Sequence, residues 1–108
     1  MTTMGAAPDV FEALADPTRR WMLQRLARDG AQTPTRLAEQ LPISRQAVSR
    51  HLSVLQRSKL VRAQQQGREQ RYELTPAPLD DARAFIRELE LAWDTRLLAL
   101  GQLLADEA

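Results

Sequence analysis

The 108-residue sequence predicts one mainly α-helical domain of about five helices, with a two-stranded β-hairpin and a long C-terminal helix. Three observations support this fold class. Helix-starting residues recur before short apolar stripes over residues 9–58. Two strand-like runs then flank a glycine-containing turn over residues 59–74. From residue 76 onward, apolar residues recur every three or four positions.

The first two helices are predicted from Asp9 and from Asp16-Pro17, because aspartate caps helix N-termini and proline suits the first helical position. The second helix should end at Asp29-Gly30, where glycine can adopt a left-handed conformation. We expect residues 1–8 to form a flexible N-terminus and residues 9–108 to form a single domain. The apolar residues expected on one face of each helix are Val10, Phe11, Leu14, Met22, Leu23 and Leu26.

Residues 33–58 predict a short helix, a tight connection and a second helix. Thr33-Pro34 repeats the helix-start signal, Pro42 ends the short helix, and Ser44 caps the next one. Two helices joined in this way form a helix-turn-helix, whose second helix enters the major groove of DNA. The residues expected to face the core are Leu37, Ala38, Leu41, Ala47, Val48, Leu52 and Leu55.

Residues 59–74 predict the hairpin, with strands over residues 59–64 and 69–74. The turn between them contains Gly67, which tolerates positive φ, and Arg68. A helix-turn-helix followed by a hairpin is a winged helix-turn-helix, and Arg68 would lie at the tip of the wing.

The last predicted helix covers residues 76–105. A regular helix of about 25 residues within these bounds, with a rise of 1.5 Å per residue, would be nearly 40 Å long. Its apolar stripe comprises Ala82, Phe85, Ile86, Leu89, Trp93, Leu97, Leu100 and Leu104.

Composition excludes several kinds of site. Without cysteine there is no disulfide, thiolate zinc site or cysteine nucleophile, and the single histidine rules out common multi-histidine metal sites. We find no nucleophile–base constellation and no glycine loop for phosphate, so we expect no enzyme, no cofactor and no metal site. No run is long enough to span a membrane and residues 1–10 do not resemble a secretory signal, so we expect a cytoplasmic protein.

The net charge of +1 conceals an uneven distribution. Residues 36–71 carry eight basic and two acidic side chains, whereas residues 72–108 carry three basic and eight acidic ones. A basic middle segment beside an acidic C-terminal segment favours one face that binds a polyanion and another that is turned away from it.

The outer face of the second helix of the helix-turn-helix suits DNA. Arginine can pair with guanine, glutamine with adenine, and serine with bases or phosphates. We predict that the DNA-binding residues are Ser44, Arg45, Gln46, Ser49, Arg50 and His51 on this helix, together with Arg68 on the wing.

The sequence resembles the ArsR/SmtB-like bacterial repressors over residues 10–104. The resemblance rests on residues 11–20 (FEALADPTRR), 37–39 (LAE), 43–52 (ISRQAVSRHL), 60–61 (LV), 67–68 (GR) and 71–72 (RY). It implies a homodimer that binds an inverted repeat in a promoter, with the first and last helices at the subunit interface. The interface residues we expect are Val10, Phe11, Phe85, Leu89, Trp93, Leu97, Leu100 and Leu104.

The chain departs from the metal-sensing members of that family. The cysteine pair would fall near Thr33 and Thr35, and the last helix has no histidine. The chain therefore resembles the metal-independent branch, which includes SdpR-like autorepressors. This resemblance implies double-stranded DNA as a partner and leaves the signal open, whether a small molecule, a protein or none.

Several residues have more than one interpretation. Ser44 can cap its helix and also approach a phosphate, and His51 can contact a phosphate or pack against a neighbouring helix. Trp93 can belong to the dimer core or to a ligand pocket between subunits. Arg19 and Arg20 fit capping, helix packing or DNA contact equally well.

The same residues also fit one alternative function. The chain could be a winged-helix module whose basic face binds an acidic protein. The hydrogen-bonding side chains at helical spacing argue against it, because a protein interface favours exposed aromatic residues.

Overall fold

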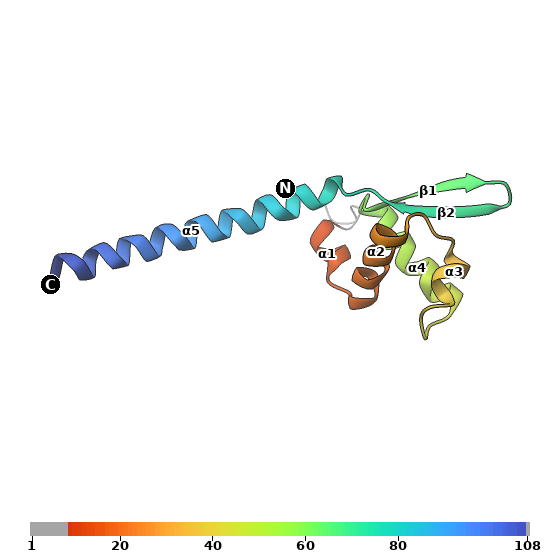
Figure 1. The fold of residues 1–108 in the computed structure, drawn as a ribbon, viewed down its shortest axis with the longest axis horizontal. Coiled ribbons are helices and arrows are strands. Elements are labelled where there is room, and N and C mark those ends of the chain that lie inside the picture. Colours follow the sequence, from red (N-terminus) through yellow and green to blue (C-terminus); the bar gives the residue numbers. More distant parts are fainter. Residues whose placement is uncertain (1–8, 108) are drawn as a thin grey trace.

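The computed structural model describes residues 9–107, which form a small helical domain with a hairpin on one side and a long helix leading away from it (Figure 1). Its elements in order are α1 (Val10–Leu14), α2 (Pro17–Asp29), α3 (Pro34–Ala38), α4 (Arg45–Arg57), β1 (Val61–Gln66), β2 (Glu69–Leu74) and α5 (Ala77–Glu107). The winged helix-turn-helix is thus confirmed. The flexible segment expected at residues 1–8 lies outside the described residues.

Each of the first four helices begins at the cap that the sequence predicts. The side chains of Asp9, Asp16, Thr33 and Ser44 accept hydrogen bonds from backbone N–H groups three residues later, at 2.8–3.1 Å. These bonds satisfy donors that have no partner inside the helix. Because such caps depend only on neighbouring residues, they fix the helix boundaries locally.

Asp16 is the cap whose strength should depend on pH. The Arg19 N–H that donates to its carboxylate, aided by the charges of His51 and Arg19, lowers the pKa of Asp16 in spite of partial burial. A lowered pKa in the folded state adds stability above the unfolded pKa of about 3.9, and this stability is lost as the pH falls through the folded pKa.

We expect Asp16→Ala to lower the free energy of unfolding by about 1 kcal/mol at pH 7 and by less at pH 3. Urea unfolding at the two pH values measures the difference. Ser44→Ala is the control, since it removes a cap that does not titrate and should cost the same at both. An equal loss for Asp16→Ala at pH 7 and pH 3 would contradict the assignment.

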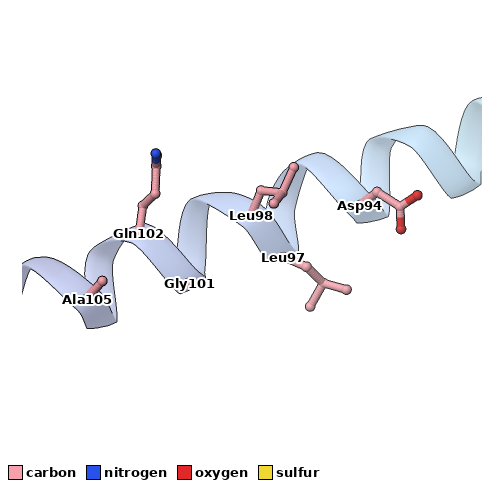
Figure 2. Close-up of a pocket in the computed structure, with 6 residues that line it drawn as sticks. All are labelled: Asp94, Leu97, Leu98, Gly101, Gln102 and Ala105. Atoms are coloured by element: carbon pink, nitrogen blue, oxygen red, sulfur yellow. The ribbon is translucent and has the colours of Figure 1, made fainter.

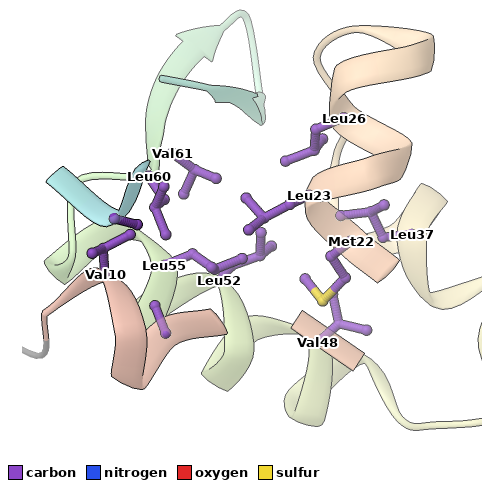
Figure 3. Packing of buried hydrophobic residues seen from close by; sticks show 12 residues of the cluster. Val10, Met22, Leu23, Leu26, Leu37, Val48, Leu52, Leu55, Leu60 and Val61 are labelled. Atoms are coloured by element: carbon purple, nitrogen blue, oxygen red, sulfur yellow. The ribbon is translucent and has the colours of Figure 1, made fainter. Parts of the chain in front are cut away.

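The core lies where α1, α2, α3 and α4 meet the base of the hairpin (Figure 3). Its fully buried members include Met22 from α2, Leu37 from α3, and Leu52 and Leu55 from α4. Leu60 and Val61 close it from the start of the hairpin. The α4 helix therefore sits with one face fixed in the core, which leaves its opposite face for function.

The hairpin is antiparallel, with Val61 paired to Leu74 and Gln66 paired to Glu69. Gln32 also pairs with Tyr72 through two backbone hydrogen bonds of 3.0 and 2.8 Å, which ties the segment before α3 to β2. This pairing holds the wing beside the helix-turn-helix.

The first strand begins later than the sequence predicts. Lys59 has a φ of 65° and donates its N–H to the Gln56 carbonyl, so it terminates α4 and does not begin β1. The turn is also tighter, with only Gly67 and Arg68 between paired residues. Gly67 has a φ of 62°, which glycine favours at the first position of a two-residue hairpin loop.

Helix α5 has 31 residues and runs to Glu107, beyond the predicted end at residue 105. It projects from the domain, and the described residues extend over 71 × 31 × 22 Å (Figure 1). At its root, the rings of Phe85 and Phe11 meet edge to face, with centroids 5.2 Å apart. Among residues 9–107, no helix is long and apolar enough to cross a membrane.

Candidate nucleic-acid interface

Helix α4 presents four of the predicted DNA-binding side chains on its outer face. Val48, Leu52 and Leu55 are fully buried on its inner face. The side chains that remain exposed on the outer face are Arg45, Gln46, Ser49 and Arg50. Ser44 accepts from the Ala47 N–H at 3.1 Å, so its capping role is confirmed, and its phosphate contact stays a prediction.

A groove of about 660 Å³ lies between α3, the N-terminal half of α4 and the wing. Three predicted residues line it, namely Arg45, Ser49 and Arg68, although they come from two separate elements. Gln46 and Arg50 are exposed on α4 but lie outside this lining. The structure therefore brings the wing tip and the start of α4 to one surface.

The groove also contains polar residues that the sequence analysis did not select. They are Thr33, Thr35, Arg36, Glu39, Gln65, Glu69, Gln70 and Tyr72. Gln65 and Gln70 are cross-strand partners, so a two-residue turn would have placed them opposite each other. The longer turn assumed from the sequence concealed that signal.

The charge of the groove is mixed. Arg36 lies 3.8 Å from Glu39, and Arg71, next to the groove, lies 3.9 Å from Glu69. Arg45 and Arg68 take part in none of the ion pairs found within residues 9–107. These two arginines are thus available for phosphates or base edges.

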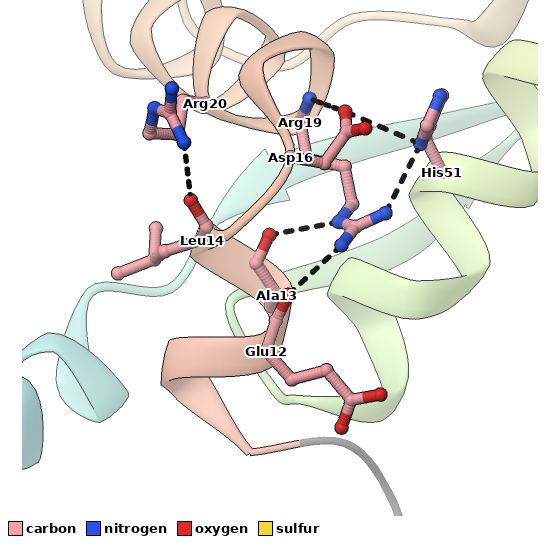
Figure 4. A network of polar contacts seen from close by, with 7 residues as sticks. All are labelled: Glu12, Ala13, Leu14, Asp16, Arg19, Arg20 and His51. Carbon is pink, nitrogen blue, oxygen red and sulfur yellow. Dashed lines mark hydrogen bonds and ion pairs between the residues drawn. The ribbon is translucent and has the colours of Figure 1, made fainter.

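His51 is not part of the groove lining and points toward the junction of α1 and α2 (Figure 4). Its Nδ1 lies 3.5 Å from the Arg19 guanidinium and 3.9 Å from the Asp16 carboxylate, and the side chain is only 24% exposed. The structure thus shows the packing role that the sequence left open. A phosphate contact by His51 stays a prediction.

Arg19 and Arg20 both hold the end of α1. Arg19 donates to the carbonyl oxygens of Ala13 and Glu12 at 2.8 and 2.9 Å, and Arg20 donates to that of Leu14 at 2.8 Å. The Glu12 carbonyl also accepts the N–H of Ala15 at 3.2 Å. The last carbonyls of a helix have no partner further along it, so the arginines supply a C-terminal cap.

A second candidate surface runs along α5. In the described residues, the large apolar side chains that remain exposed are Phe11 and, on α5, Phe85, Ile86, Leu89, Leu91, Trp93, Leu97, Leu98, Leu100, Leu103 and Leu104. All expected interface residues except Val10 are among them. Val10 instead lies in the core of the protomer, where it is 7% exposed because α1 packs its inner face against the domain.

The distal part of α5 is apolar on more than one side (Figure 2). Leu97 and Leu98 project in different directions, and a shallow hollow beside them is lined by Asp94, Gly101, Gln102 and Ala105. All these residues come from a single helix, so the hollow is an open helix face. An apolar face of this size in water normally marks a surface that another protein covers.

Within residues 9–107, the structure brings together no group of three or more metal-ligating side chains. The two candidate functional surfaces of the described residues are the groove and the exposed face of α5.

Comparison with known proteins agrees with this geometry. A family model described as a helix-turn-helix domain matches residues 14–64. The HTH-type transcriptional regulator Rv2034 of Mycobacterium tuberculosis is 37% identical over 107 residues, which cover 99% of this chain and 96% of that protein. The transcriptional repressor SdpR of Bacillus subtilis is 34% identical over 74 residues, or 68% of this chain and 81% of that one.

Among solved structures, an ArsR-like transcriptional regulator from Rhodococcus sp. RHA1 superposes with a TM-score of 0.81 at 39% identity, over 90% of this chain and 88% of that one. Sequence identity, chain coverage and fold thus agree. The chain belongs to the ArsR-like family of winged-helix transcriptional regulators, which bind DNA and are not enzymes.

Proposed function

We propose that the chain acts as a homodimeric repressor that binds an inverted-repeat operator. The observation that carries this proposal is the exposed face of α4 beside the wing tip, with Arg45, Ser49 and Arg68 on one groove. Two copies related by a two-fold axis would place their α4 helices in successive major grooves, roughly 34 Å apart.

The dimer is supported by the exposed apolar face of α5. Trp93 is 56% exposed and Leu104 is 69% exposed in the single protomer, far from any core that could cover them. A helix with such a face is stabilised mainly by packing against a partner. The contact between Phe11 and Phe85 places α1 beside this face, so both helices would contribute to the interface.

We assign roles to the DNA-binding residues by their positions. Arg45, Gln46, Ser49 and Arg50 would approach base edges, because they occupy the outer face of α4. Arg68 would enter the minor groove or contact a phosphate from the wing tip. Ser44 would add a phosphate contact through its backbone N–H.

Repression would follow because an occupied operator blocks polymerase access to the promoter, and the regulated gene would include the chain's own. Because its target would be promoter DNA, we propose that the protein acts in the cytoplasm. Its sequence lacks the cysteine pair and the C-terminal histidine of the metal-sensing members, so release would depend on a small molecule or protein that binds the two dimer geometries with different affinity.

Fluorescence anisotropy with the DNA upstream of the gene and with a scrambled duplex tests this function. We expect the upstream DNA to bind about a thousandfold or more tightly, with log affinity falling linearly with log salt concentration. Equal binding to both duplexes would contradict regulation at that promoter. Binding to neither at low salt would favour the protein-interaction alternative.

We expect Arg50→Ala to weaken specific DNA binding by about 1–3 kcal/mol, because it removes a side chain that reads a base. Folding should stay nearly unchanged, since Arg50 is exposed. The measurement is the affinity for operator and for random DNA. Arg57→Ala is the matched control, an exposed arginine in the last turn of the same helix. An equal loss on both duplexes would mark a phosphate contact instead.

A further inference from the structure

One side chain, that of Arg19, connects the three helices α1, α2 and α4. Arg19, in the first turn of α2, donates two hydrogen bonds to carbonyl oxygens at the end of α1. Its remaining nitrogen lies 3.5 Å from Nδ1 of His51, in the middle of α4 (Figure 4). Its backbone N–H is held by the Asp16 carboxylate at 2.9 Å, and that carboxylate also approaches His51.

These polar contacts lie beside apolar packing, because Val10 and Ala13 of α1 belong to the same buried cluster as Leu52 and Leu55 of α4. Helix α1 has only five residues, so it has little stability of its own and depends on these contacts. On its far side, Phe11 meets Phe85 at the root of α5. A continuous series of contacts therefore runs from α4 through Arg19 to α1, and from α1 to α5.

We propose that Arg19 is a positioning residue that holds α4 at a fixed place relative to α1 and α5. The inference rests on the proposed dimeric operator binding. In such a dimer, α1 and α5 set the position of the partner copy, and α4 reads DNA. The contact of Arg19 with α1 and α4 then determines the distance between the α4 helices of the two copies. That distance must match one turn of DNA.

The guanidinium suits this task for a physical reason. Its planar fork has several donors in fixed directions, so one side chain can bind two carbonyls and still face a third group. Lysine has a single flexible ammonium and cannot hold the three groups at once. A positive charge on lysine would therefore not reproduce the contacts that the Arg19 guanidinium makes.

The matched control is the neighbouring residue. Arg20 also donates to a carbonyl of α1, at 2.8 Å from the Leu14 oxygen, but it has no contact with α4 among the hydrogen bonds and ion pairs of the described residues. Arg20→Ala should remove one hydrogen bond to the end of α1 and leave the contact between Arg19 and His51 of α4 intact.

The test uses the full chain and the duplex that footprinting with the unmodified protein identifies. Affinities are measured for this operator, for versions with one base pair added or removed between half-sites, for a single half-site and for random DNA. Size and folding of each variant are checked by sedimentation and circular dichroism.

We expect Arg19→Ala to lower affinity for the native operator about tenfold and to reduce its preference over the altered spacings by a similar factor. Binding to the half-site and to random DNA should change less than about twofold, because no DNA contact is lost. Arg19→Lys should behave like Arg19→Ala. If the alanine variant does not fold, the lysine variant provides the same test. Arg20→Ala should retain the spacing preference.

Three outcomes would overturn the assignment. They are an unchanged spacing preference in Arg19→Ala, an equal loss on operator and random DNA, and full restoration by lysine. Failure of the proposed function is distinguishable, because the unmodified protein would then show no preference for the operator over random DNA.

Discussion

Leu52→Ala is expected to lower the free energy of unfolding by about 3–5 kcal/mol, the range for a leucine removed from a closed core. Leu52 is fully buried at the centre of α4, and the cluster around it draws on every element from α1 to β1. A domain of this size has a total stability of only about 5–15 kcal/mol, so the loss would leave it marginal.

Urea unfolding followed by circular dichroism measures this loss, at one fixed protein concentration because dimerisation also stabilises the fold. Ser53→Ala is the control, since the neighbouring side chain is exposed on the same helix and should shift stability by less than about 0.5 kcal/mol. A loss of 1 kcal/mol or less for Leu52→Ala would mean that the core closes over the missing side chain and that α4 is less firmly held than the structure indicates.

Trp93→Ala should weaken self-association by about 3–5 kcal/mol for each ring that becomes buried in the dimer. The ring is 56% exposed in the protomer, so its removal should leave the fold of a single copy nearly unaffected. Sedimentation equilibrium over a range of concentrations measures the dimer dissociation constant. Operator affinity should fall in parallel, because a single copy reads only half of the repeat.

Leu98→Ala is the matched control for Trp93→Ala. It removes an exposed apolar side chain of the same helix that projects in a different direction from Leu97, a member of the stripe containing Trp93 (Figure 2). It should therefore weaken association less. A folded, dimeric Trp93→Ala protein with normal operator affinity would contradict the dimer core and would favour a ligand pocket between subunits.

The helix boundaries could be predicted because their causes are local. Asp9, Asp16, Thr33 and Ser44 each bond a backbone N–H three residues away, so their effect is independent of the rest of the fold. The start of β1 was less predictable. Lys59 resembles a strand residue in sequence, and only the turn after α4 gives it a positive φ.

The candidate site was predictable on α4 and less so elsewhere. Arg45 and Ser49 follow from helical spacing, whereas Arg36 and Gln70 reach the groove only because α3 and β2 pack beside α4. The contact between Arg19 and His51 joins residues 32 positions apart. No local pattern predicts such a contact, since it depends on how α2 crosses α4.

The exposed stripe of α5 also affects how the protein would respond to its own abundance. If only the paired form reads the operator, then at low concentration the occupied fraction should grow with the square of the amount of chain. Monomeric copies, whose α5 helix would expose its apolar face to water, would meanwhile be substrates for chaperones and proteases. Repression would therefore set in over a narrow range of synthesis rates, and the length of α5 would help to set that threshold.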